Sequence, residues 1–220
     1  AAGVAHEMNN PLTYAMLNLQ KVHGVLAARR DDSELHALQE SVTFAIEALQ
    51  RMRDIVRDLM DVARDDGERV GVSLHGVLES SLRIAQHHIE PRARVIRSYG
   101  DVPPVRAVVS RLGQVFVNLL VNAAQSMPAG RPDANELRIS TTSDELGSAI
   151  VEIADTGSGI PPDLLQRVFD PFVTTKSDGT GLGLFLCKRL VSSMGGELTV
   201  VKTGADGTTM QVRLLAAKPA

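Results

Sequence analysis

The stretch Ala149–Gly159, AIVEIADTGSG, indicates how the C-terminal part of this 220-residue chain folds. Its first six residues are rich in Ile and Val, which predicts a strand. Asp155 follows at the strand end, and Gly157 and Gly159 come shortly after it. Because glycine has no side chain, the backbone can approach a bound molecule closely at these two positions. A carboxylate at such a place suits a planar ligand with an exocyclic amine, and an ordinary turn of Asp and Gly is the alternative.

A second glycine-rich segment, GTGLGL, occupies residues 179–184 and opens a helix that is predicted around Leu182–Met194. Free backbone amides at a helix N-terminus form a natural site for phosphate. The spacing differs from that of dinucleotide-binding proteins, and the Gly-Lys-Ser/Thr of a P-loop is missing. Lys176 lies just upstream and can reach a terminal phosphate, although a glycine-rich loop that simply enters a helix is the alternative. The candidate phosphate-binding residues are Gly179, Thr180, Gly181, Leu182 and Gly183.

A helix predicted over Arg111–Met127 carries two asparagines, Asn118 and Asn122, four positions apart on one face. Apolar side chains occupy its other faces. Asparagine is unfavourable inside a helix unless its amide has hydrogen bonds to make. Two stacked amides suit a hydrated cation such as Mg²⁺, which keeps several waters and takes few protein ligands. A pair of surface or capping amides is the alternative.

The N-terminal part carries apolar residues in alternating steps of three and four, first over residues 5–26 and again over 35–63. This is a heptad pattern on two helices, and the polar connection Arg29–Ser33 separates them. A two-helix hairpin alone cannot bury both apolar seams, so a second copy is expected to complete a dimeric four-helix bundle. The alternative is a helical pair packed on the rest of the chain. It is disfavoured because the repeat is closer to the coiled-coil period of about 3.5 residues than to the α-helical period of about 3.6.

His6 projects away from the first seam if Ala5 and Met8 face it. A neutral imidazole on the outside of a rigid helix is a good nucleophile. Glu7 is adjacent and can take the proton that the ring loses. Asn10 lies one turn further along and reaches the same patch. A single surface histidine usually has no catalytic role. The interpretation of His6 therefore rests on the order and combination of all the motifs.

The part of the chain after residue 70 mixes helices and strands without a regular strand–helix–strand alternation. This order of predicted elements indicates an α+β sandwich, with helices on one face of a largely antiparallel sheet. Helices are expected up to residue 90, over 111–127 and over 182–194. The expected strands are 71–74, 94–99, 137–142, 149–154, 198–201 and 208–215.

The composition, 44% hydrophobic and 22% charged, is typical of a soluble globular protein. A net charge of −3 without a basic stripe argues against nucleic-acid binding. The single Cys187 excludes an internal disulfide and suits a reducing compartment. No apolar stretch approaches the roughly 20 residues of a membrane span, and no signal peptide is visible. We therefore expect a cytoplasmic fragment that makes no membrane contact itself, begins inside a helix and lacks its upstream part.

Five motifs, taken together and in their order, resemble those of the sensor histidine kinases of two-component systems. AHEMNNPL resembles the phospho-acceptor box, NLLVNAAQSM the Asn box, DTGSGI the first Gly box and GTGLGL the second. FDPFVTTK, at Phe169–Lys176, resembles the start of the ATP lid. The sequence HEMNNPL and the short lid are most similar to those of the nitrogen-regulation type of sensor kinase. The likeness covers nearly the whole chain.

The resemblance implies a multidomain chain. A dimerising all-α hairpin would occupy residues 1–66, and a Bergerat (GHKL-type) ATP-binding sandwich, shared with the Hsp90 chaperone and type II topoisomerases, would occupy 67–220. The activity implied is ATP-dependent autophosphorylation of His6, with Glu7 as base, followed by phosphotransfer to an aspartate of a response regulator. Asn10 would orient water in a phosphatase reaction on that partner.

The resemblance also implies roles in the ATP site. Asp155 would bind the adenine amine in a pocket shaped by Gly157 and Gly159. Asn122 would ligate Mg²⁺, with Asn118 beside the phosphates. The phosphates would be held under the lid by Gly179, Gly181 and Gly183. Two other functions remain as alternatives: a degenerate kinase that dimerises and scaffolds without phosphorylating, and an ATP-driven machine of the chaperone or topoisomerase class, which needs no helical histidine.

Overall fold

The computed structural model describes residues 13, 15–24, 42–43, 45–46, 49, 70–176 and 179–217. The chain divides into two compact units, residues 1–65 and 66–220. The described residues of the first unit are helical. The predicted site residues His6, Glu7 and Asn10 lie outside the described residues, as does most of the expected hairpin. None of the helices in the described ranges is long and apolar enough to cross a membrane.

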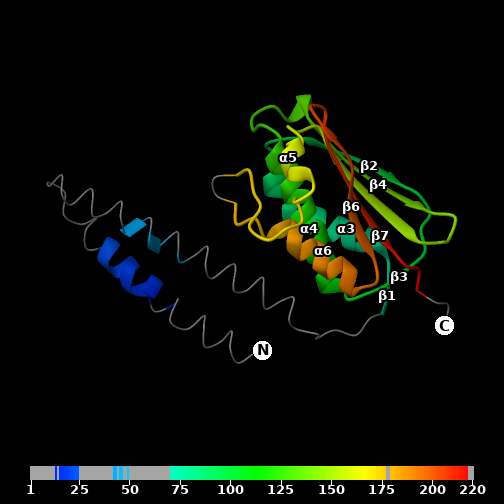
Figure 1. Cartoon of the computed structure of the whole chain (residues 1–220), viewed down its shortest axis with the longest axis horizontal. Helices are drawn as coiled ribbons and strands as arrows, with labels where there is room; N and C mark the ends of the chain where they lie inside the picture. Colours follow the sequence, from blue (N-terminus) through cyan, green and yellow to red (C-terminus); the bar gives the residue numbers. More distant parts are fainter. Residues whose placement is uncertain are drawn as a thin grey trace. The chain divides into compact units, whose positions relative to one another are not determined.

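Within residues 70–176 and 179–217, the second unit is a sandwich of a five-stranded sheet and a layer of helices (Figure 1). The strands, in spatial order, are β2 (Arg94–Tyr99), β4 (Glu136–Ser143), β5 (Ala149–Asp155), β7 (Gly207–Leu214) and β6 (Glu197–Gly204). β2 runs parallel to β4, whereas β4–β5, β5–β7 and β6–β7 are antiparallel pairs. A separate two-stranded sheet joins β1 (Val70–Val72) to β3 (Val105–Ala107).

One face of the five-stranded sheet is covered by helices α3 (Leu74–Ile89), α4 (Val109–Ser126) and α6 (Gly183–Ser193) (Figure 1). α4 packs against both of the other helices and against β5. Two short elements lie in the connections, the 3₁₀ helix η1 (Pro132–Ala134) and the one-turn helix α5 (Pro162–Leu165). α4 therefore lies between the other two helices and also contacts the sheet.

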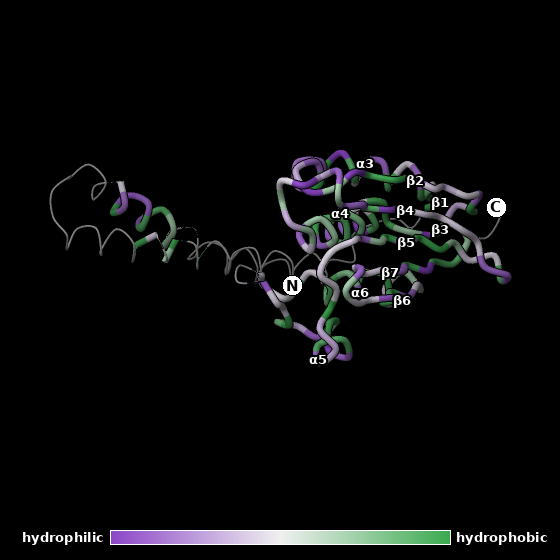
Figure 2. The backbone as a smooth tube through the Cα atoms, turned by 90° about the horizontal axis from the view of Figure 1, so that it is seen from above, coloured by the Kyte–Doolittle hydropathy of each residue, from purple (hydrophilic) through white to green (hydrophobic). Residues whose placement is uncertain are grey.

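The core explains why these segments take up these structures. α4, drawn in Figure 2 with its hydropathy, turns inward a face of buried residues: Leu112, Val115, Phe116, Leu119, Leu120, Ala123 and Ala124. In β5 the side chains alternate, and Val151 and Ile153 are fully buried. Because side chains two residues apart in a strand share a face, the same alternation carries Asp155 toward the interior, where it is 8% exposed.

The expected α+β architecture is confirmed, with helices on one face of a largely antiparallel sheet. The strand 94–99 has the predicted bounds. Leu74 was expected to end the first strand but begins α3, because Ser73 is already the N-cap of that helix. The sequence patterns missed β3, η1 and α5, which are only three or four residues long. Elements of that length are too short to show a periodicity.

Candidate functional site

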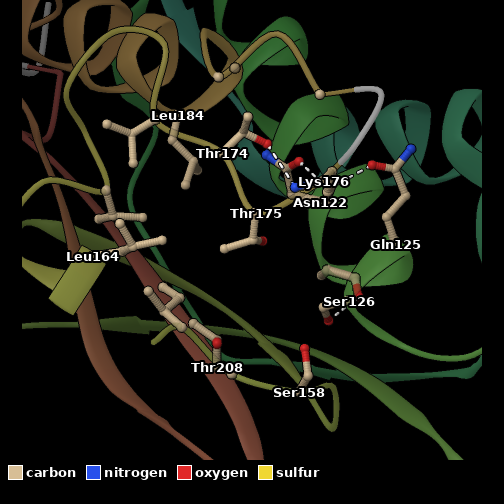
Figure 3. Close-up of a pocket in the computed structure, with 18 of the residues that line it drawn as sticks. Asn122, Gln125, Ser126, Ser158, Leu164, Thr174, Thr175, Lys176, Leu184 and Thr208 are labelled. Carbon is tan, nitrogen blue, oxygen red and sulfur yellow. Dashed lines mark hydrogen bonds between the residues drawn. The ribbon is translucent and has the colours of Figure 1, made fainter. Parts of the chain in front are cut away.

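A cavity of about 520 Å³ opens between the C-terminal half of α4, the end of β5 and the segment that leads into α6 (Figure 3). Its volume lies within the range of roughly 300–1,000 Å³ that is usual for small-molecule sites. Apolar side chains from α4, α5 and β7 line one part of the wall: Leu119, Ala123, Leu164 and Met210. Polar groups line the rest: Asn122, Gln125, Ser126, Asp155, Ser158, Thr174, Thr175, Lys176, Thr180 and Thr208.

Asp155 lies at one end of this cavity, where β5 stops. Its Oδ1 accepts three hydrogen bonds: from Ser126 Oγ at 3.0 Å, from the backbone N–H of Gly157 at 2.8 Å and from that of Thr208 at 3.3 Å. In the described part of the chain these bonds all fall on one oxygen. The other oxygen, Oδ2, therefore remains as an acceptor for a ligand in the cavity.

The environment of Asp155 acts on its protonation in two opposite ways. Burial raises the pKa of the carboxyl above its ordinary value, because a charge is poorly solvated inside the fold. The hydrogen bonds from Gly157, Ser126 and Thr208 act in the other direction and offset part of this effect. A buried carboxyl that is fixed by three donors and still lacks a partner for one oxygen is typical of a binding group rather than of a structural ion pair.

Glycine is required beside this carboxylate for steric reasons. A Cβ at Gly157 would lie 2.0 Å from Ser126 Oγ, so no larger residue fits without moving α4. At the other end of the cavity, Gly181 has a φ of +67°, and a Cβ there would lie 2.4 Å from the carbonyl carbon of Phe172. Both glycines are thus required by close contact with other parts of the chain, whereas the sequence pattern had suggested close approach to a bound molecule at Gly157.

The second glycine-rich motif leads directly into α6, which begins at Gly183. Among the described residues no side-chain hydrogen bond caps this helix. The first amides of an α-helix have no partner inside the helix, so the start of α6 can bind an anion. Gly183 and Gly181 both line the cavity, and Gly179 and Thr180 do so too.

Lys176 reaches into the cavity toward α4 (Figure 3). Its Nζ donates to Asn122 Oδ1 at 3.0 Å and to Gln125 Oε1 at 2.7 Å. Burial lowers the pKa of Lys176, and the positive charge of Arg92 lowers it further. The ammonium shows that the amide oxygens at this point of the cavity can hold a cation, so the residues present fit the Mg²⁺ that the sequence predicted.

The structure brings most of the predicted site residues of the second unit to one cavity: Asn122, Asp155, Gly159, Lys176, Gly179, Thr180, Gly181 and Gly183. Asn118, Gly157 and Leu182 do not line it. Gly157 donates its backbone N–H to Asp155, and Leu182, the N-cap residue of α6, is buried. Asn118 lies one helical turn before Asn122, and its role stays a prediction.

Several residues of the site were not singled out from the sequence, and three of them, Ser126, Gln125 and Thr208, donate to or accept from the side chains of Asp155 and Lys176. Ser126 and Gln125 follow Asn122 by four and three positions, so the helical spacing of neighbours on one face was the signal that could have found them. Thr208 comes from β7, more than fifty residues after Asp155. No local pattern marks it, because its place is set by the pairing of β5 with β7.

An α+β sandwich with a buried carboxylate at one end of its cavity and a helix N-terminus at the other is the arrangement expected of a nucleotide-binding ATPase domain. The family model described as "Histidine kinase-, DNA gyrase B-, and HSP90-like ATPase" matches residues 107–218. The model "His Kinase A (phospho-acceptor) domain" matches residues 1–68. The chain therefore belongs to the histidine kinase-, DNA gyrase B- and HSP90-like ATPase family, as the catalytic core of a two-component sensor histidine kinase.

Two relatives agree with this assignment. The chain is 30% identical, over 97% of its length, to the signal transduction histidine-protein kinase AtoS of Escherichia coli strain K12 and covers 34% of that protein. It is 32% identical, over 100% of its length, to the sensory histidine kinase/phosphatase NtrB of Rhizobium leguminosarum bv. phaseoli and covers 58% of it. A kinase/phosphatase named NtrB is thus among its relatives, and the chain spans only part of each relative.

Two solved structures share the fold over nearly the whole chain. Full-length ShkA in complex with AMPPNP superposes with a TM-score of 0.72 at 24% identity, covering 100% of this chain and 46% of that one. The histidine kinase AdeS of Acinetobacter baumannii gives a TM-score of 0.65 at 21% identity, covering 97% of this chain and 98% of that one. At this level of identity the two superpositions support the fold.

Proposed function

We propose that this chain binds ATP in the cavity, transfers the γ-phosphoryl group to His6, and passes it on to an aspartate of a response regulator. The observation that carries the proposal is the arrangement of one cavity: Asp155 lies at one end, and Lys176 and the start of α6 lie at the other. A phospho-acceptor family match over residues 1–68 of the same chain supplies the acceptor.

In this proposal the end of the cavity at Asp155 is the base end, and the end at Lys176 and the start of α6 is the phosphate end. Oδ2 of Asp155 accepts a hydrogen bond from the adenine amine, while Ser126 and Thr208 hold the carboxylate in place. The amides around Gly181 and Gly183 receive the phosphates. Phosphoryl transfer depends mostly on positioning and on neutralising charge, so a site with fixed donors at the phosphates suits it.

The transfer itself balances in the following way. One ring nitrogen of His6 forms a bond to the γ-phosphorus, and the bond from that phosphorus to the bridging oxygen of ADP breaks. The other ring nitrogen loses its proton to Glu7, which acts as the base. We assign Mg²⁺ to Asn122, with Asn118 beside the phosphates, and the metal when bound would neutralise phosphate charge.

The partners follow from the N-terminal unit. We propose that two copies pair through these helices, because the expected seam residue Val22 is 44% exposed in the single chain and needs a second surface. The response regulator would dock on the same bundle near residues 12–19. Asn10 would orient a water in the reverse, phosphatase reaction. This part of the proposal rests on the family match and the heptad pattern.

The test is to incubate the chain with γ-labelled ATP and to compare it with His6→Ala. Acid-labile label is expected on the wild type and none on the variant, because a phosphoramidate is hydrolysed in acid. His23→Ala is the matched control, since it removes another histidine of the same helical unit. Equal acid-labile labelling of His6→Ala would remove His6 from the mechanism. Steady ATP hydrolysis without any labelled protein would instead favour the ATP-driven machine.

A further inference from the structure

Two amide side chains of α4 converge on one ammonium group at the phosphate end of the cavity. Asn122 and Gln125 are three positions apart in the helix, so both can point toward the same space. The distances from Lys176 Nζ are 3.0 Å to Asn122 Oδ1 and 2.7 Å to Gln125 Oε1 (Figure 3). Both groups present their oxygen to the ammonium.

The positive charge of the cavity wall lies on the Lys176 ammonium, where it contacts these two amides. Lys176 is the one basic side chain among the described residues that line the cavity, and it is half-buried. Lys188 and Lys202, by comparison, are exposed on α6 and β6. Amide oxygens accept hydrogen bonds from an ammonium and also coordinate hard cations, whereas their nitrogens do neither. The oxygens of Asn122 and Gln125 therefore form a surface suited to one cation.

We propose that Asn122 and Gln125 form a single cation subsite, which the Lys176 ammonium fills in the nucleotide-free chain and which Mg²⁺ takes over when a nucleotide binds. The inference rests on the proposed function and adds two things to it. Gln125 becomes a residue of the metal subsite, and Lys176 becomes a competitor of the metal as well as a phosphate ligand.

The competition follows from electrostatics. An ammonium and a divalent cation repel each other strongly at contact distance, so the same two oxygens cannot hold both. Metal that arrives with the nucleotide must therefore release Lys176. The released side chain can then turn to the terminal phosphate. The two amide oxygens thus bind a cation in both states: the Lys176 ammonium in the nucleotide-free chain and Mg²⁺ in the nucleotide-bound chain.

The test titrates Mg²⁺ into the full chain with N-methylanthraniloyl-ADP and measures the Mg²⁺ concentration that gives half of the metal-dependent fluorescence change. ADP is used because it lacks the terminal phosphate that Lys176 would bind. Lys176→Met keeps the aliphatic stem and removes the charge. We expect this variant to need about fivefold less Mg²⁺, the order of effect of a charge-assisted hydrogen bond. Lys202→Met, an equal charge loss on the exposed part of β6, is expected to match the wild type.

A second comparison isolates Gln125. In the Lys176→Met background the competitor is gone, so Gln125→Ala acts only on the metal. The double variant Lys176→Met/Gln125→Ala is expected to need about fivefold more Mg²⁺ than Lys176→Met alone. Circular dichroism of each variant checks that the fold is kept.

Two results would overturn the subsite while leaving the proposed function in place. One is an unchanged Mg²⁺ requirement in Lys176→Met with nucleotide binding intact. The other is a double variant that behaves like Lys176→Met. If the wild type binds no labelled ADP at any Mg²⁺ concentration, the proposed function itself fails, and the subsite fails with it.

Discussion

The two ends of the cavity are built in different ways. At the base end, Asp155 is fixed by donors from α4, β7 and the loop that follows β5. At the phosphate end, the Lys176 ammonium is held by the side-chain amides of Asn122 and Gln125, and the neighbouring Thr174 and Thr175 are exposed. The base end is therefore complete before a ligand arrives, whereas the phosphate end is arranged around a cation that the chain itself supplies.

This difference predicts at which end of the cavity substitutions should have the larger effect. A carboxylate held by three elements has no room for an altered group, so small substitutions there should have large effects. A contact between flexible side chains should respond more weakly, because the partners can rearrange. The predictions below test the base end, in order of decreasing effect.

The largest effect is expected from Asp155→Asn. The amide oxygen can still accept the three hydrogen bonds made to Oδ1, so the fold should be kept. The amide nitrogen then replaces Oδ2 and presents a donor to a ligand that itself donates. Nucleotide affinity should fall by at least about a hundredfold, since a site built to accept one hydrogen bond strongly rejects a mismatched partner. Calorimetric titration with ADP measures this, and unchanged affinity would contradict the assignment of the base end.

The next effect concerns stability. Gly157→Ala should destabilise the fold by about 2 kcal/mol, because the new Cβ would lie 2.0 Å from Ser126 Oγ and force α4 to move. The matched control is Gly76→Ala in α3, where a Cβ would meet nothing within 4 Å. That change should stabilise by up to about 1 kcal/mol, because alanine is the better helix former. Urea denaturation gives both values, and similar effects of the two would show that the base end is loosely packed.

A smaller effect is expected from Ser126→Ala. This variant removes one of the three donors to Asp155 Oδ1 but leaves the two backbone donors. Nucleotide affinity should fall about fivefold, the usual net value of one hydrogen bond. Phosphorylation at saturating ATP should be unchanged, because the serine acts on the base end only. A loss in the saturated rate with unchanged affinity would assign Ser126 to the phosphate end instead.

The smallest effect is a pH dependence of folding stability. Because burial raises the pKa of Asp155, the folded chain keeps this proton to a higher pH than the unfolded chain does. The contribution of Asp155 to stability is therefore largest below its ordinary pKa and falls as the pH rises through the interval up to the raised value. Asp155→Asn should remove this slope, which denaturation curves over a series of pH values can show. If stability falls more steeply with rising pH in the variant than in the wild type, the sign is contradicted.

Much of this site could be predicted from the sequence. The motifs located Asp155, Asn122, Lys176 and, in the second glycine-rich segment, Gly179, Thr180, Gly181 and Gly183, and the structure brings them to one cavity. Local chemistry made this possible, since strand ends, helix starts and glycine spacing are visible in short stretches. Asn118 was grouped with Asn122 by its spacing, but the cavity borders only the last turns of α4. Spacing fixes a shared helix face and does not say how far along the helix a neighbouring wall extends.

The sequence by itself determined the order of all elements but β3, η1 and α5, the inward direction of Asp155 through the alternation of β5, and the apolar face of α4. Only the tertiary structure decided which groups complete the site. Thr208 meets Asp155 because β5 and β7 pair, and Lys176 meets Gln125 across more than fifty residues of chain. The physical reason is that periodicity records the direction of a side chain within its own element. The partner it finds there depends on how the layers pack.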